Sequence, residues 1–219
     1  MRVRTLLAAT VTLSATLVAP IAAQPVARPA PRLGVLAGAS IATLSGDPVD
    51  EWGNRTGFVA GAALTVPLTS VVSFQPEVLF AQKGAALSED GFTATFKLDY
   101  VEVPLLLRVD MPTTGSAVRP HLFAGPALAF KASCDVEASG QGVSASRPCR
   151  DIANEEDEED LKSFDAGLML GGALGFDIGR QRLNVGARYT LGLTKLVSAD
   201  DVRNRAITLY GSLDFPLGR

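Results

Sequence analysis

The chain has 219 residues, of which 47% are hydrophobic and 20% charged, and its formal net charge is −3 at pH 7. This balance lacks the clustered basic face that nucleic-acid binding requires, so no nucleic-acid partner is expected. The length fits a single domain.

Residues Met1 to Ala23 have the build of a secretory signal peptide. Arg2 and Arg4 form a basic start, an apolar run follows, and small residues precede a cleavage site before Gln24. Cleavage would leave 18 basic residues against 23 acidic ones. We therefore expect a signal peptide over 1–23, a periplasmic N-terminal linker over 24–32 and one domain over 33–219.

Eight stretches of the mature chain alternate apolar residues with small or polar ones, which is typical of β-strands with one apolar face. The predicted strands are Leu33 to Ile41, Phe58 to Val66, Val72 to Phe80, Val101 to Val109, Pro120 to Phe130, Phe164 to Asp177, Leu183 to Leu191 and Ile207 to Phe215. Their apolar faces carry no charged residue, and most cover about 9 to 11 residues, the length that a tilted strand needs to cross hydrocarbon.

The connections between these strands alternate between long and short. The long ones are Ser45 to Arg55, Gly84 to Lys97, Lys131 to Lys162 and Lys195 to Asn204, and the short ones are Leu68 to Val71, Met111 to Ala117 and Gly179 to Gln181. Short periplasmic turns and long extracellular loops are typical of outer-membrane barrels. The fold class predicted is all-β, an eight-stranded antiparallel up-and-down transmembrane β-barrel. A soluble barrel with its faces swapped gives the same periodicity and stays open as an alternative.

The only two cysteines, Cys134 and Cys149, lie in the longest connection. An exported chain meets an oxidising compartment, so we expect them to form a disulfide. The same connection contains six consecutive acidic residues, Glu155, Glu156, Asp157, Glu158, Glu159 and Asp160. A solvated loop is the expected interpretation of this run, and divalent cation binding is the alternative. No cofactor is expected.

Four charged residues lie on the polar faces and are predicted to point into the barrel: Glu77, Glu102, Arg108 and Arg188. The third and seventh predicted strands lie opposite each other in a ring of eight, and Glu77 and Arg188 fall near their middles. Because an unpaired buried charge is costly, we expect these two to form an ion pair across the interior.

Catalysis is not expected. His121 is the only histidine, and it is predicted to point inward near the periplasmic end of its strand. A lipid hydrolase would need a nucleophile and its base near the outer rim.

Several segments together resemble the PorT-like outer-membrane β-barrel family, whose members are often described as porin-family proteins. They are Gly34 to Gly38, Phe74 to Glu77 with Gln82 to Gly84, Leu98 to Leu107, Pro120 to Pro126 and Ala187 to Leu193. The resemblance implies an eight-stranded barrel in the outer membrane of a Gram-negative bacterium. The secretion role of the family's namesake is not carried over.

The expected function is that of a non-enzymatic outer-membrane barrel with a side-chain-filled lumen and a structural or surface-interaction role. Its expected partners are outer-membrane lipid and lipopolysaccharide, the barrel assembly machinery during insertion, and an extracellular or secretion-system partner that the sequence does not identify. Two alternatives stay open: a narrow channel or small-molecule binder that uses the lumen charges, and a secreted, lipocalin-like ligand binder.

Overall fold

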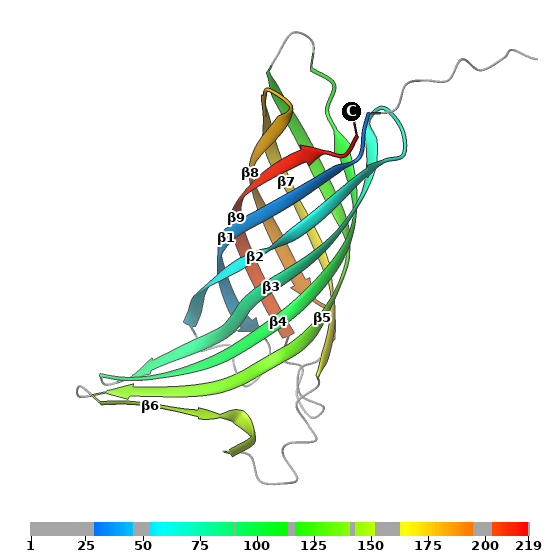
Figure 1. The fold of residues 1–219 in the computed structure, drawn as a ribbon. Coiled ribbons are helices and arrows are strands. Elements are labelled where there is room, and N and C mark those ends of the chain that lie inside the picture. Colours follow the sequence, from blue (N-terminus) through cyan, green and yellow to red (C-terminus); the bar gives the residue numbers. More distant parts are fainter. Residues whose placement is uncertain are drawn as a thin grey trace, which may run out of the picture.

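The computed structural model describes residues 29–45, 53–89, 91–113, 117–140, 143–151, 163–194 and 203–218, which form strands joined mostly by turns (Figure 1). The elements are β1 (Arg32–Ser45), β2 (Gly53–Pro67), β3 (Val72–Glu89), β4 (Phe92–Asp110), β5 (Val118–Gly140), β6 (Val143–Pro148), the 3-10 turn η1 (Cys149–Asp151), β7 (Phe164–Ile178), β8 (Gln181–Gly192) and β9 (Arg203–Pro216). Among the described residues, no helix is long and apolar enough to cross a membrane.

Eight of the strands form a closed antiparallel ring. Each strand pairs with the next along the chain, β5 pairs with β7, and β1 pairs with β9 along all of its 14 residues. β6 lies outside the ring and pairs with β5. The predicted eight-stranded up-and-down barrel is confirmed.

The two faces of the ring differ in chemistry as predicted. Large apolar side chains alternate outward on every barrel strand, and Val35, Leu122, Val185 and Leu209 are each more than half exposed. The neighbouring positions point inward, where Leu36, Phe123, Met169 and Tyr210 help to fill the interior. A soluble barrel would need the opposite arrangement, so the alternative with swapped faces is wrong.

Phenylalanines mark both edges of the outer apolar band. Phe58 contacts Phe80, and Phe130 contacts Phe164, each with ring centroids 5.5 Å apart. Phe176 lies twelve residues beyond Phe164 on β7. At about 3.3 Å per residue and a tilt of about 40°, that interval covers roughly 30 Å, the thickness of a bilayer core.

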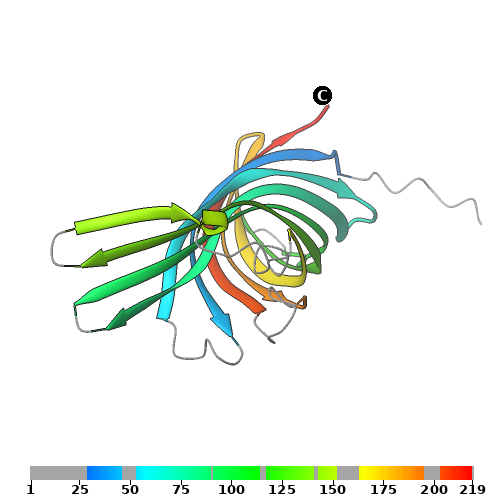
Figure 2. The same cartoon turned by 90° about the horizontal axis from the view of Figure 1, so that it is seen from below.

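Parts of two predicted loops prove to be strand. β3 and β4 continue through most of Gly84 to Lys97, and β5 continues into Lys131 to Lys162, where β6 pairs back onto it. The extensions form a sheet that leaves the ring at the end opposite the C-terminus and projects to one side (Figures 1 and 2). These segments were predicted as loops because their alternating residues are mostly Ala, Ser and Thr rather than large apolar ones.

Gly84 marks the point where β3 turns out of the ring. Its φ of 126° is a conformation that favours glycine, and a Cβ there would overlap the carbonyl oxygen of Phe96 on β4. The pairing of β2 with β3 shifts register in the same region, between Asn54 and Val59. Such an irregularity bends a sheet, so it redirects the extended strands away from the barrel axis.

Leu170 lies midway between Phe164 and Phe176, points outward and is 46% exposed. We predict that Leu170→Lys lowers the free energy of unfolding in lipid vesicles by about 2–4 kcal/mol, because it places a charge in the hydrocarbon. The matched control is Val143→Lys on the projecting sheet, at a position that is 72% exposed. It should change stability by less than about 0.5 kcal/mol. Equal losses in denaturant titrations of the two variants would contradict this placement of the membrane.

Candidate functional site

The centre of the lumen holds an ion pair between β3 and β8. Arg188 Nη1 lies 2.6 Å from Glu77 Oε2, and the two side chains are 2% and 0% exposed. The predicted contact across the interior is therefore present. Gln75 Nε2 also donates to Glu77 Oε1 at 2.7 Å, so both carboxylate oxygens are hydrogen-bonded.

Aromatic rings hold the Arg188 guanidinium in place. Its carbon lies 4.3 Å from the ring centroid of Tyr210 and 5.5 Å from that of Phe123, on β9 and β5. Such cation–π contacts are stronger where water is excluded. The voids above and below this layer each have a volume of about 10 Å³, room for one water molecule. The layer therefore plugs the lumen.

The other two predicted lumen charges belong to different clusters. Glu102 pairs with Lys83 on β3, on the side of the plug toward the projecting sheet. Arg108 binds Asp110 through Nη2 at 2.7 Å, on the side toward the termini. Arg108 Nη1 also reaches Gln75 Oε1 at 3.4 Å, so Gln75 links Arg108 to the Glu77 pair while Glu102 stands apart.

Sequence reasoning missed the partners of these charges. Lys83 continues the inward alternation of Leu79 and Ala81, but the predicted strand ended at Phe80, so its position on the polar face was not recognised. Asp214 was placed on the polar face of the last strand but not singled out. It accepts a hydrogen bond from Asn184 Nδ2 at 2.9 Å and lies 4.0 Å from Arg108.

The structure places His121 inside the barrel, 3% exposed, with its ring 6.3 Å from that of Phe123. The acidic run Glu155 to Asp160 lies outside the described residues. Among the residues that are described, no cluster of three or more His, Cys, Asp or Glu side chains has the geometry to hold a metal ion.

The projecting sheet forms a second candidate site. Cys134 on β5 and Cys149 in η1 are joined by a disulfide with a Cα–Cα distance of 5.4 Å, which fastens the end of β6 to its neighbour. Cross-strand partners share a face, and one face gathers the apolar side chains of Leu87, Phe96, Val136 and Val143, with Arg147 opposite Val136.

The opposite face of the sheet is polar. It carries hydroxyl side chains on all four strands and a Lys97–Glu137 ion pair. The apolar face is the continuation of the lumen-facing side of β3, β4 and β5, because Leu98 and Ala85 on it are buried at the mouth of the barrel. The sheet therefore presents apolar groups beyond the outer aromatic band.

A family model described as "Outer membrane protein beta-barrel domain" matches residues 23–198. The chain belongs to this family. It is an outer-membrane protein, and the predicted location and broad family are confirmed. The narrower PorT-like assignment stays a prediction.

Solved structures with a similar fold include three bacterial barrels. Neisserial surface protein A (NspA) has 16% identity and a TM-score of 0.49, covering 84% of this chain and 97% of its own. Ail of Yersinia pestis has 17% identity and a TM-score of 0.43, with coverages of 85% and 99%. OprG from Pseudomonas aeruginosa has 9% identity and a TM-score of 0.47, with coverages of 87% and 98%. A search of curated proteins gave no match.

The Glu77–Arg188 pair generates a double-mutant test. We predict that Glu77→Gln and Arg188→Gln each lower the free energy of unfolding by about 3–5 kcal/mol, because each leaves a buried charge without its partner. The double variant should lose clearly less than the sum of the two, as measured by denaturant titration in vesicles.

The exposed pair of Arg119 and Asp177, whose side chains are 44% and 32% exposed, is the matched control. Arg119→Gln and Asp177→Asn should couple by about 1 kcal/mol or less. Additive losses at Glu77 and Arg188 would show that the central pair contributes no coupling.

Proposed function

We propose that this chain is a non-enzymatic surface protein of the outer membrane, in which the barrel anchors the projecting sheet outside the cell. The observation that carries the proposal is the exposed apolar face of that sheet, where Phe92 and Val143 are 51% and 72% exposed. Apolar side chains gathered on one face beyond the membrane are typical of a protein-interaction surface.

The orientation of the barrel supports an extracellular position for the sheet. The short turns and the C-terminus lie at one end of the ring, and the sheet leaves the other end (Figure 1). Outer-membrane barrels keep short turns in the periplasm and long connections outside. The polar face of the sheet, with its hydroxyls and the Lys97–Glu137 pair, would then meet lipopolysaccharide, and the apolar face would meet an extracellular partner.

The lumen argues against transport and against catalysis. The Glu77–Arg188 layer fills the cross-section, and voids of about 10 Å³ do not admit a hydrated ion or a nutrient. His121 is buried at the periplasmic half of the barrel, far from the outer rim where lipid or extracellular substrates arrive. A structural or binding role is what these features favour.

Single-channel recording separates this proposal from the narrow-channel alternative. The refolded protein in planar bilayers should show no sustained conductance, both as the full chain and after replacement of residues 132–162 by a short Gly-Ser linker. Steady openings in the full chain would favour a channel instead.

Attachment tests the surface role directly. Cells of an adhesin-free host that display the wild-type chain should aggregate or be retained on protein-coated surfaces more than cells displaying Phe92→Ser/Val143→Ser. Leu170→Ser, a change of the same kind on the lipid-facing side, is the control and should leave retention unchanged at equal surface expression. Equal retention of cells displaying the wild type and the sheet variant would show that the apolar face is not the contact surface.

A further inference from the structure

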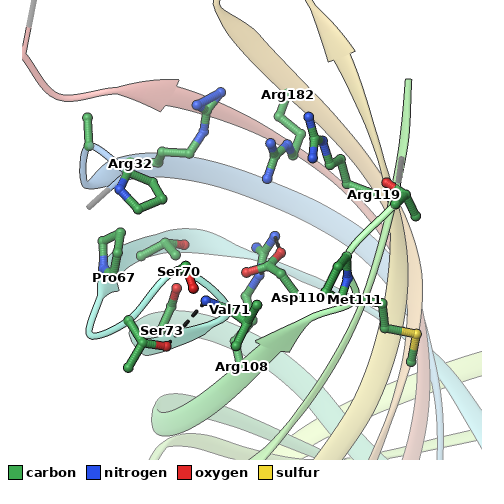
Figure 3. A pocket seen from close by; sticks show the side chains of 16 residues that line it. Arg32, Pro67, Ser70, Val71, Ser73, Arg108, Asp110, Met111, Arg119 and Arg182 are labelled. Atoms are coloured by element: carbon green, nitrogen blue, oxygen red, sulfur yellow. Dashed lines mark hydrogen bonds and ion pairs between the residues drawn. The ribbon is translucent and has the colours of Figure 1, made fainter. Parts of the chain in front are cut away.

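The end of the barrel opposite the projecting sheet contains a blind vestibule of about 520 Å³ (Figure 3). Its walls come from the first residues of β1 and β8, the turn between β2 and β3, the end of β4 and the start of β5. Its floor is the Arg108 cluster below the plugged lumen. The volume lies within the range of small-molecule sites, about 300–1,000 Å³.

Four arginines line the vestibule and approach it from different strands: Arg32, Arg108, Arg119 and Arg182 (Figure 3). Asp110 is the only acidic residue in its described lining. Guanidinium groups that converge on one cavity repel each other unless an anion lies between them, so the lining favours a negatively charged ligand.

Carboxylates neutralise only part of this charge. Asp110 is taken up by Arg108, and Asp177 is shared between Arg119 Nε at 3.1 Å and Arg182 Nε at 2.7 Å. Asp214 lies 4.0 Å from Arg108 Nη1, so three carboxylates stand against the four guanidiniums and one positive charge is in excess.

Arg32 carries this excess charge. Its Nη2 donates to the carbonyl oxygen of Arg180 at 2.8 Å, and within the described part of the chain no carboxylate lies within 4.0 Å of it. Its Nε is buried and has no hydrogen-bond partner there. A buried donor without an acceptor is costly. An anion in the vestibule would compensate the charge of this guanidinium.

We propose that this vestibule binds a small anionic molecule that carries a phosphate or carboxylate group, from the periplasmic side. Arg32 and Arg182 are the residues assigned to hold it, and the hydroxyls of Thr65 and Ser70 lie in the same wall. Because the plug closes the floor, the ligand enters and leaves by the same mouth. The site therefore binds its ligand and does not conduct it, which is independent of the surface role of the sheet.

Calorimetry of the full-length mature protein in a non-ionic detergent at low ionic strength tests the proposal, with pyrophosphate and citrate as separate probes. At least one should bind saturably with one site per chain, and the tighter one identifies phosphate or carboxylate as the preferred group. We expect Arg32→Gln to weaken binding about tenfold or more, since one charge-assisted contact is lost.

Arg205→Gln is the matched control, because Arg205 is exposed at the far end of β9, opposite Thr43 and Leu191. It removes the same charge and should keep wild-type affinity. Arg32→Lys keeps the charge but loses the planar guanidinium, so it should give an intermediate affinity. This variant replaces Arg32→Gln in the test if Arg32→Gln fails to fold. No saturable heat with either probe at about 10 mM, or equal weakening by the variants at 32 and 205, would overturn the proposal.

Discussion

Backbone hydrogen bonding in hydrocarbon is the constraint on which the rest of this structure depends. A strand in the bilayer has no water to satisfy its N–H and C=O groups, so an open sheet edge there would cost several kcal/mol per group. The pairing of β1 with β9 removes both edges at once. Beyond the membrane the constraint no longer applies, and β6 is an edge strand of the projecting sheet.

Closing the ring with eight strands makes the interior narrow, and the interior chemistry follows from that. Gly38 and Gly171 leave room for the lumen rings, since a Cβ at Gly38 would overlap Tyr210 on the paired strand and one at Gly171 would overlap Phe123. Arg188, Glu77, Phe123 and Tyr210 then fill the centre. On either side of this layer the Lys83–Glu102 pair and Arg108 stay buried, whereas Arg119 and Asp177 at the mouth near the termini are exposed to water.

The part of the molecule that could be predicted from the sequence was the part where apolar and polar residues alternate with a period of two. Alternation located all eight barrel strands, and the opposition of two strands in a ring of eight was enough to pair Glu77 with Arg188. Within the projecting sheet, β3, β5 and β6 carry only one large apolar residue each, so these segments were predicted as loops. The vestibule is lined by Arg32, Arg108, Arg119 and Arg182, which come from four strands. Which of these residues meet depends on how far each strand is shifted along its neighbours, and the spacing of residues in the sequence does not give that shift.

Site-directed spin labelling along β9 is the most direct test of the central claim, that hydrocarbon contacts one face of the closed ring. Labels at Ile207→Cys and Leu209→Cys, introduced without the native cysteines, should be accessible to oxygen dissolved in the lipid. Labels at Thr208→Cys and Tyr210→Cys should not, because these positions point into the plugged lumen. Uniform accessibility along the four positions, or the opposite alternation, would contradict the account.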